Sequence, residues 1–387
     1  MTTNFLLIYC PITDKTMNRI INYAGTFPQP FPQFRIFPNK ERFCFMKNHQ
    51  ITIIDIAREL GISKSTVSRA LTNSTNISPE TREAVLKKAK ELDYQPNMLA
   101  LGLIRNESRT LGVVIPDIQK PFFAAIVSGI QHTVSRIGYR IVIAQSDESP
   151  EVEKENIKAL MLSRVDGFIV CHTRDTKDFE HIKLLHGKGY PLVSFARICP
   201  ELPIPKVVED DFNGLYTTTQ HLIEQGKKRI ALLAGPRQLL ASKLRVNGYK
   251  VALQQHGIPF DKELVAHTKF LHDQVAAALE RWLSLKNPPD GICTVYDAGA
   301  VKLVELLKQK GIKVPDEIAV AGFGDDPAAS IIEPGLTSYA QKPYEIGVVA
   351  GRYMLDLLNK KYPVHHSDMT ICKGTLVVRK STCSRLR

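Results

Sequence analysis

The sequence contains no pair of cysteines at a spacing used by zinc sites or redox-active disulfides. Its 387 residues include seven scattered thiols: Cys10, Cys44, Cys171, Cys199, Cys293, Cys372 and Cys383. An odd and dispersed set of thiols argues against a disulfide framework and indicates a reducing compartment. His365 and His366 lie near Cys372, but their spacing matches no standard zinc pattern, so we expect neither a metal site nor a bound cofactor.

Long apolar runs are also missing. No stretch approaches the roughly 20 apolar residues that a helix needs to cross a bilayer. The short run FLLIY at residues 5–9 has no basic residue before it, which does not match a signal peptide. We therefore expect no contact with a membrane and a cytoplasmic location.

Sequence motifs of common enzyme classes are absent as well. There is no GxSxG nucleophile elbow, no phosphate-binding P-loop and no pair of metal-ligating motifs. The segment GFGDD at residues 322–326 follows an expected strand but lacks the rest of a dinucleotide-binding fingerprint. We expect that the protein is not an enzyme.

What the sequence has in excess is positive charge. It carries 51 Lys and Arg against 39 Asp and Glu, which gives a formal net charge of +12 with histidine neutral. Such an excess favours an anionic partner, although it does not specify one. Hydrophobic residues make up 44% of the chain, enough for sizeable cores, and the length indicates two or three domains.

Residues 1–45 differ from the rest of the chain. They hold seven of the sixteen phenylalanines and five prolines, and no helical or strand period lasts more than a few residues. Two interpretations stay open: a flexible arm, or translated upstream sequence ahead of a natural start at Met46. In either case we expect this segment to be disordered or absent from the native product.

Residues 46–95 contain three expected helices, and each begins at a hydroxyl side chain that caps the N–H groups of the first turn. Asp55 completes a capping box in the first helix, which Gly61 ends. Two short helices about a glycine-containing turn, followed by a third, are the arrangement of a helix-turn-helix. The expected N-caps are Thr52, Ser63 and Ser78.

The second of these helices, KSTVSRAL at residues 64–71, has many hydroxyls and few apolar side chains. Val67 and Leu71, four residues apart, are expected to face the core. The outward side chains would then suit a DNA major groove, where Lys and Arg donate to guanine and serine bonds to bases or phosphates. The alternative is a small polar helix with ordinary caps. The outward side chains are Lys64, Ser65, Ser68 and Arg69.

From residue 110 onward, apolar runs alternate with amphipathic segments. Strands are expected at 110–117, 139–146, 165–171, 191–196, 228–235, 290–296 and 317–324. Helices are expected at 122–137, 151–163, 212–226, 241–256, 275–285, 298–310 and 344–360. The nearly continuous apolar strands indicate parallel sheets buried on both faces. The alternation predicts an α/β fold with doubly wound parallel sheets, and the length of this part favours two lobes.

Two segments resemble the DNA-binding headpiece of the LacI/GalR family of bacterial transcription regulators: TIIDIARELGISKSTVSRAL at 52–71 and ISPETREAVLKKAKELDYQPNMLA at 77–100. The TVSR core and the Y-x-P-N-x-x-A pattern are specific in combination, and the likeness extends from about Ile51 to Arg379. The resemblance implies that Lys64, Ser65 and Arg69 read bases. The residues that it places near phosphates are Thr52, Ser63, Thr66, Ser68 and Asn97, with the segment 78–82.

By the same resemblance, residues 96–109 are a hinge that forms a short helix on operator DNA. Leu103 matches a leucine that enters the minor groove and kinks the duplex, and Ala100 lies one turn before it. The chain departs from the usual basic or polar residues at Leu101 and Gly102. Because glycine lowers helix propensity by about 1 kcal/mol, we expect this hinge to depend on DNA and a partner chain for its order.

Residues 110–387 resemble the family's effector domain, which has the fold of periplasmic sugar-binding proteins and in which two lobes close on a small ligand. The resemblance gives Arg245 the role of gripping ligand hydroxyls or carboxylates, and Asp297 that of accepting from sugar hydroxyls. The chain departs from relatives at Ala196 and Tyr296, so the ligand need not be a hexose. The implied ligand-binding residues are Phe122, Phe123, Asp147, Arg197, Arg245 and Asp297.

The resemblance implies a transcriptional regulator, a repressor, that binds a pseudopalindromic operator in double-stranded DNA as a homodimer. A small effector, a sugar or sugar derivative bound between the lobes, would control its operator affinity. Two other interpretations compete: an extracytoplasmic sugar-binding protein of a transport system, and an α/β enzyme. The transport protein would need a signal peptide and would not carry residues 51–105.

Overall fold

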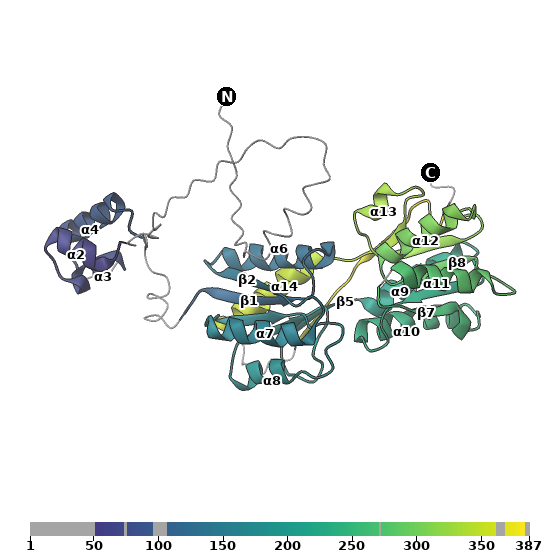
Figure 1. Ribbon diagram of the computed structural model, residues 1–387, viewed down its shortest axis with the longest axis horizontal. Coiled ribbons are helices and arrows are strands. Elements are labelled where there is room, and N and C mark those ends of the chain that lie inside the picture. Colours follow the sequence, from purple (N-terminus) through teal and green to yellow (C-terminus); the bar gives the residue numbers. More distant parts are fainter. Residues whose placement is uncertain (1–50, 73–75, 96–106, 271, 361–367, 384–387) are drawn as a thin grey trace, which may run out of the picture. The chain divides into compact units, whose positions relative to one another are not determined.

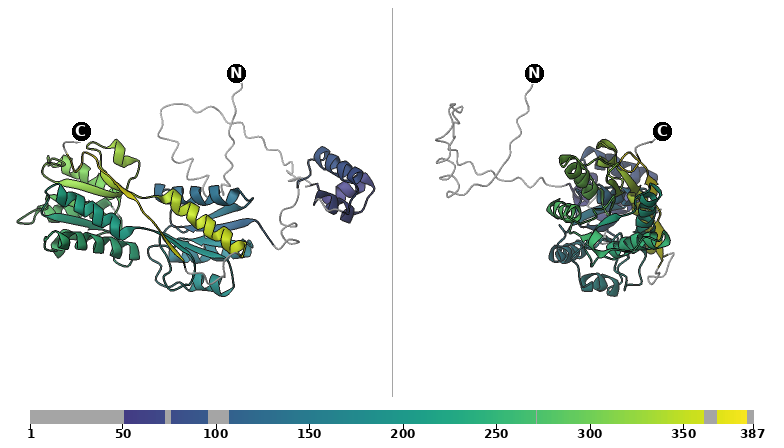
Figure 2. Two further views of the ribbon diagram at one scale, coloured as in Figure 1. Left: turned by 180° about the vertical axis from the view of Figure 1, so that it is seen from behind. Right: turned by 90° about the vertical axis from the view of Figure 1, so that its right-hand side faces the viewer.

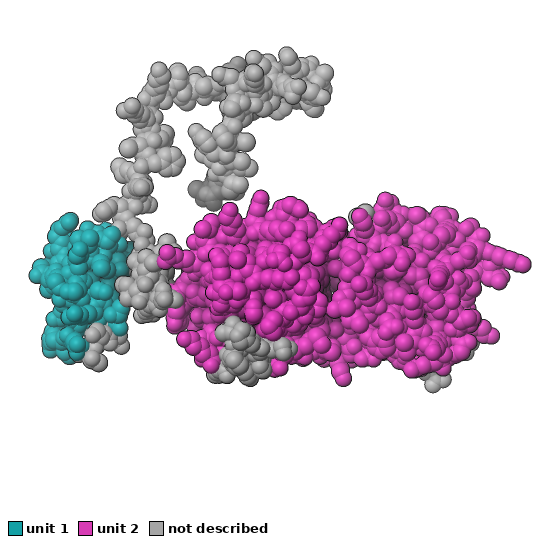
Figure 3. Space-filling view, turned by 90° about the horizontal axis from the view of Figure 1, so that it is seen from below, with its two compact units in different colours: residues 1–96 teal, residues 97–387 magenta. Residues whose placement is uncertain are grey.

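The chain forms two compact units, residues 1–96 and 97–387, drawn in different colours in Figure 3. The computed structural model describes residues 51–72, 76–95, 107–270, 272–360 and 368–383. The expectations for residues 1–45 and for most of the hinge lie outside these ranges. Within them, no helix is both long enough and apolar enough to span a membrane.

Unit 1 has three described helices, α2 (Ile53–Leu60), α3 (Lys64–Leu71) and α4 (Pro79–Glu91). The backbone N–H of Thr52 donates to the Asp55 carboxylate at 2.9 Å, and Ser63 Oγ accepts from a backbone N–H of the first turn of α3 at 3.1 Å. Gly61 ends α2 with a φ of 64°, a left-handed conformation that glycine adopts without a steric penalty. The N-caps are therefore the three residues that the sequence predicts.

Each helix of unit 1 contributes a fully buried side chain to one small core. Ile56 of α2, Val67 of α3 and Val85 of α4 are all 0% exposed. Ala70 of α3 is buried as well, while Leu71, the other residue predicted to face inward, is only partly buried against the cluster. One face of α3 is thus fixed by packing, which leaves its other face to solvent.

Unit 2 folds as two α/β lobes (Figure 1). The sheet of lobe 1 has the strand order β11-β5-β4-β3-β1-β2, with all neighbours parallel. Its strands are β1 (Thr110–Ile115), β2 (Arg140–Gln145), β3 (Gly167–Val170), β4 (Leu192–Phe195), β5 (Lys206–Glu209) and β11 (Met369–Cys372). Its helices are α6 (Pro121–Ser135), α7 (Pro150–Leu162), α8 (Glu180–Gly187) and α14 (Pro343–Leu358).

Lobe 2 has the strand order β12-β10-β9-β8-β6-β7. Only the pair β10–β12 is antiparallel among its described strand pairs. Its strands are β6 (Ile230–Ala234), β7 (Val265–His267), β8 (Gly291–Thr294), β9 (Ala319–Gly324), β10 (Thr337–Ala340) and β12 (Thr375–Val377). Its helices are α9 (Asp211–Glu224), α10 (Leu240–Gln255), η2 (Lys262–Leu264), α11 (His272–Leu283), α12 (Asp297–Gln309) and α13 (Ala328–Ile331).

The chain passes between the lobes three times. It leaves lobe 1 after β5, returns after β10 to form α14, and leaves again between β11 and β12. Figures 1 and 2 show α14 over the lobe 1 sheet, and Figure 1 shows the later yellow segment running from one lobe to the other. This arrangement confirms the predicted fold class, which combines two doubly wound lobes with a separate helical headpiece.

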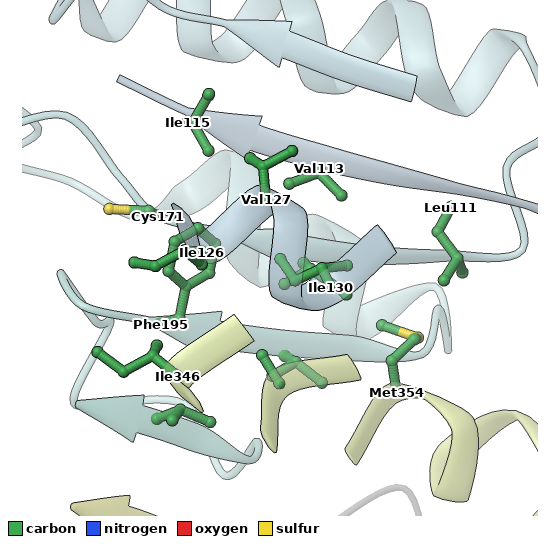
Figure 4. Packing of buried hydrophobic residues seen from close by; sticks show 14 of the residues in the cluster. Leu111, Val113, Ile115, Ile126, Val127, Ile130, Cys171, Phe195, Ile346 and Met354 are labelled. Carbon is green, nitrogen blue, oxygen red and sulfur yellow. The ribbon is translucent and has the colours of Figure 1, made fainter. Parts of the chain in front are cut away.

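Close contact between α6 and α14 holds the late helix to lobe 1. A methyl group on Gly129 would lie 2.3 Å from the Tyr344 carbonyl oxygen, and one on Gly347 would lie 2.1 Å from that of Ile126. The backbones approach this closely because neither glycine has a side chain. Figure 4 shows Ile346 and Met354 of α14 among the buried side chains of this core. The packing fixes α6, whose first turn borders the site described below.

The expected strands correspond to observed strands, but burial on both faces is wrong for β2. Val142 and Ile143 on β2 are 45% and 43% exposed, because β2 lies at the edge of its sheet. Several short elements were not predicted from the sequence. They are β5, β7, β10, β11, β12, α8, α13 and η2.

Candidate functional site

The outer face of α3 carries the side chains expected to contact DNA. Lys64, Ser65 and Arg69 are exposed, whereas Thr66 and Ser68 are partly buried. Val67 and Ala70 are the buried side chains of the same two turns. Because 3.6 residues make a turn, burying 67 and 70 directs 65 and 69 away from the core and leaves 64 at its margin. The basic side chains of α3 are therefore available to an anionic partner.

The N-terminal end of α3 is a cluster of hydroxyls without a carboxylate in the first turn. Ser63 Oγ lies 2.7 Å from Ser65 Oγ and 2.8 Å from Thr66 Oγ1. Exposed N–H groups, the positive end of the helix dipole and hydroxyl donors together suit a phosphate oxygen. The hydroxyl of Thr52 donates to Asp55 at 2.7 Å. Asn97, Ala100 and Leu103, also expected at the DNA, lie outside the described residues.

A cavity of about 440 Å³ lies between the two lobes of unit 2. Its walls come from the segments that follow β1, β4, β6, β8 and β9, and from two of the crossing segments. Ligand sites of doubly wound folds occur at this edge, where the strands present their carboxyl ends. Of the predicted ligand-binding residues, Phe122, Phe123, Arg197, Arg245 and Asp297 line it, whereas Asp147 does not.

Arg197 is held in place by an acid that the sequence analysis missed. Its guanidinium donates two hydrogen bonds to Glu148, at 2.7 and 2.9 Å. Burial disfavours ionisation of Glu148, but the hydrogen bonds and charge of Arg197 outweigh it and lower the pKa of Glu148 to about 2. Asp147 is exposed and accepts from Gln145. Both acids have positive φ in the turn after β2, and Glu148 is the one that contacts Arg197.

Arg245 is anchored on lobe 2 by three contacts. Its Nε donates to Asp211 at 2.7 Å and its Nη1 donates to the Val295 carbonyl at 2.6 Å. Its guanidinium also lies over the Phe323 ring, 3.9 Å from the ring centre. The planar fork is therefore fixed before a ligand arrives, so little of its conformational entropy remains to be lost on binding.

Asp297 is a buried carboxyl in the wall of the cavity, with 1% of its surface exposed. It accepts from Ser338 Oγ and from the backbone N–H of Asp326, both at 2.7 Å. Burial raises the pKa of Asp297 to about 6, although these two hydrogen bonds oppose the shift. A carboxyl held in this way offers its remaining lone pairs as acceptors.

Two crossing segments meet at the floor of the cavity. Gln341, which follows β10, donates to the carboxyl of Glu209 at the end of β5 at 3.0 Å. Burial and the nearby charge of Asp211 raise the pKa of Glu209 well above its ordinary value, which favours the protonated form of this carboxyl. Neither residue was predicted from the sequence, because the strands before them are only four residues long.

The cationic side chains that line the cavity are paired with carboxylates of the protein. Arg197 and Arg245 each have a carboxylate partner, Glu148 and Asp211, and Lys120 lies 3.6 Å from Glu148. Phe122, Phe123, Phe270, Tyr296 and Phe323 supply aromatic surface. Paired charges and aromatic rings suit an uncharged molecule with many hydroxyl groups. No group of His, Cys, Asp or Glu that could hold a metal ion occurs among the described residues.

Two family models match the chain. Residues 52–97 match the model described as "Bacterial regulatory proteins, lacI family". Residues 108–371 match the model described as "Periplasmic binding proteins and sugar binding domain of LacI family". The first match covers α2, α3 and α4, and the second covers both lobes with the cavity between them.

Individual proteins resemble the chain over most of its length. It is 33% identical over 333 residues to the HTH-type transcriptional repressor CytR of Escherichia coli strain K12, which covers 86% of the chain and 96% of the repressor. The transcriptional regulator CelR in its cellobiose complex is 30% identical, with a TM-score of 0.65 and coverage of 86% and 99%. The lac repressor dimer bound to operator and the anti-inducer ONPF is 24% identical, with a TM-score of 0.76 and the same coverage, and supports the fold alone.

Proposed function

Since the chain belongs to the LacI family of bacterial regulatory proteins, we propose that α3 reads operator DNA while a small polyhydroxylated effector binds between the lobes. As a member of this family, the protein is a DNA-binding transcriptional regulator and not an enzyme. The effector changes operator affinity because it binds one arrangement of the two lobes more tightly than another.

The single observation that carries the DNA assignment is the division of α3 into two faces. Val67 and Ala70 are buried, and Lys64, Ser65 and Arg69 are exposed. A cation that donates to guanine edges gives sequence preference, whereas hydroxyls at the helix start bind phosphates and set the register. We assign base reading to Lys64, Ser65 and Arg69. We assign phosphate contacts to Thr52, Ser63, Thr66, Ser68 and Asn97.

The effector assignment rests on the charge balance of the cavity between the lobes. An anionic ligand would meet arginines that are already paired, whereas a neutral polyol can exchange hydrogen bonds with them and with Asp297. The size of the cavity, about 440 Å³, suits a ligand of one or two sugar rings. A sugar or sugar derivative has this chemistry.

The remaining parts of the proposal concern organisation. We assign DNA binding to residues 46–95, the hinge to 96–109, and effector binding and dimerisation to 110–387. The hinge carries the minor-groove contacts of Ala100 and Leu103. Two copies of the chain bind the two halves of a pseudopalindromic operator, as a repressor, in the cytoplasm where bacterial chromosomal DNA lies.

Fluorescence anisotropy with the DNA upstream of the protein's own coding region tests the proposal. The full chain should bind this DNA at least about a thousandfold more tightly than a scrambled duplex at one fixed salt concentration. Sugars that raise the thermal midpoint of the protein should then change this affinity. Equal binding to both duplexes would contradict the DNA assignment, and a set of bound sugars without any effect on DNA binding would contradict the effector assignment.

A further inference from the structure

A second cavity, of about 500 Å³, lies on lobe 2 beside α10. Four cationic side chains line it, and no carboxylate does so among the described residues. They come from the loop after β6, from two turns of α10 and from η2: Arg237, Lys243, Lys250 and Lys262. In the described part of the chain none of the four forms an ion pair, and the Lys250 ammonium lies 4.6 Å from the centre of the Phe260 ring.

This charge distribution is the opposite of that in the cavity between the lobes. There each arginine has its own carboxylate. Here two acids flank Lys262 in sequence, but neither lines the hollow, and one of them, Asp261, is paired with Arg229 at 2.9 Å. Like charges around a hollow repel one another and produce a positive potential inside it. An anion that enters the hollow relieves this repulsion.

Two further polar groups face the same hollow. Ser242 is only 3% exposed and lines both cavities, and its hydroxyl forms no hydrogen bond with another described residue. His267 is half-buried, and its Nδ1 lies 2.9 Å from the carbonyl oxygen of Gly235. Burial lowers the pKa of His267, the hydrogen bond with Gly235 opposes this shift, and the charges of Arg237 and Lys250 add to it.

Apart from the exposed Asn247, the rest of the lining is apolar. Val246, Phe260 and Val265 form one wall, on α10, the loop after it and β7. A bare ion would leave this wall in contact with water, whereas a ligand with an apolar body would cover it. A buried hydroxyl, unpaired cations and an apolar wall together define the ligand better than charge does alone.

We propose that this cavity is a second ligand site, distinct from that between the lobes, and that it binds a small organic phosphate. The phosphate would accept hydrogen bonds from Arg237, Lys250 and Ser242. The organic part would lie against Val246 and Phe260.

The two cavities are close enough to influence each other. Gly235 lies between them: a methyl group on it would come 2.6 Å from Ser242 Oγ and 2.9 Å from the Phe270 ring. Phe270 in turn packs edge-on against Tyr296 in the wall of the first cavity, with ring centres 4.9 Å apart. The linings of the two cavities are therefore in direct contact through Ser242, Gly235 and Phe270.

Calorimetry on the full chain with phenyl phosphate as the probe tests the proposal. Phenyl phosphate should bind more tightly than inorganic phosphate, and benzyl alcohol should not bind. The double variant Arg237→Gln/Lys250→Gln should lose at least about tenfold in affinity for phenyl phosphate, because two charge-assisted contacts are removed. The matched double variant Lys286→Gln/Lys308→Gln, which removes two exposed cations elsewhere on lobe 2, should keep the parent's affinity.

The headpiece also binds phosphate groups, so Lys64→Gln/Arg69→Gln is the second control and should keep phenyl phosphate binding. An equal loss in all three double variants would mean diffuse attraction to a basic protein and would overturn the proposal. Full affinity of the Arg237→Gln/Lys250→Gln variant for phenyl phosphate would also overturn the proposal. So would a loss of operator binding in that variant without any loss of phenyl phosphate binding. The last outcome would make the surface a contact for DNA.

Discussion

At the scale of single residues, the cavity between the lobes contains carboxyls whose protonation depends on burial. Asp297 is an acceptor for Ser338 and Asp326, yet burial raises its pKa from 3.8 to about 6. The folded protein therefore holds this proton more tightly than the unfolded chain does. The resulting stability is present below pH 3.8 and is lost as the pH rises through 6.

Asp297→Asn should stabilise the protein at pH 7.5 and have little effect at pH 4. The asparagine keeps a contact with both neighbours, since its oxygen can accept from the Asp326 N–H and its NH₂ can donate to the Ser338 hydroxyl oxygen, with the Ser338 O–H turned away. A shift of about 2 pKa units corresponds to about 3 kcal/mol, which is the upper limit of the expected gain. Urea unfolding at the two pH values measures it, and Asp316→Asn, an exposed carboxyl on the same lobe, is the control. The same gain in the free energy of unfolding at both pH values would contradict a raised pKa of Asp297.

Arg69 is the residue of α3 with the clearest expected effect on DNA. Arg69→Ala should weaken operator binding by about 1–3 kcal/mol and relax the preference at one base position, because a guanidinium contacts a guanine edge in two places. Selection from a randomised operator measures both effects. Arg58→Ala removes an exposed charge from α2 of the same unit and should leave the selected motif unchanged. If Arg69→Ala selects the parent's motif, α3 does not read bases through this side chain.

At the scale of elements, the sequence predicted the helix caps and the long strands, because both depend on local chemistry. The caps at Thr52, Ser63 and Ser78 follow from hydroxyls placed before a first turn, and the long apolar strands follow from their composition. The short strands β5, β10 and β12 have three or four residues, and their pairing with distant strands creates them. No local pattern of that length separates a strand from a loop.

Within the candidate site, the residues that the family resemblance placed could be predicted, and those placed by tertiary geometry could not. Arg197, Arg245 and Asp297 were found because a family resemblance gave their positions, and each lines the cavity. Glu148 was missed because two acids stand side by side after β2 and the choice between them depends on turn geometry. Glu209 was missed because its place in the cavity comes from a chain crossing rather than from a motif.

The contact between α6 and α14 allows a test with two glycines. Gly129→Ala should destabilise the protein by about 1–3 kcal/mol, because the new methyl group overpacks a close backbone contact. Gly187→Ala at the end of α8 meets nothing within 4 Å and should be neutral or stabilising by up to about 1 kcal/mol. Denaturant unfolding of both variants measures the difference. A stable Gly129→Ala variant would show that the two helices can move apart at little cost.

At the scale of the whole molecule, the proposed regulation connects a cavity in one unit with a helix in the other. Arg245 is fixed on lobe 2 by Asp211 and Val295, and Arg197 is fixed on lobe 1 by Glu148. A ligand that bonds to both arginines favours one angle between the lobes. By linkage, operator DNA must then change effector affinity by the same factor as the effector changes operator affinity.

Arg245→Ala should leave operator affinity nearly intact without effector and abolish the response to it. Leu103→Ala, by the family resemblance, should do the reverse, with effector binding kept and specific DNA binding reduced. Calorimetry for the effector and anisotropy for the operator, at one salt concentration, measure the two variants. A normal effector response in Arg245→Ala would remove this arginine from the proposed site.

The three crossings between the lobes have a consequence for the synthesis of the protein. Residues 110–209 form five of the six strands of lobe 1, but the core side chains Ile346 and Met354 and the edge strand β11 come from the far end of the chain. When the ribosome has made the first five strands, the surface of α6 that will receive α14 is still bare. Lobe 2, which is translated between these two parts, must therefore emerge beside an unfinished neighbour. A nascent chain halted before Pro343 should expose this apolar surface to chaperones, and one released after Cys372 should not.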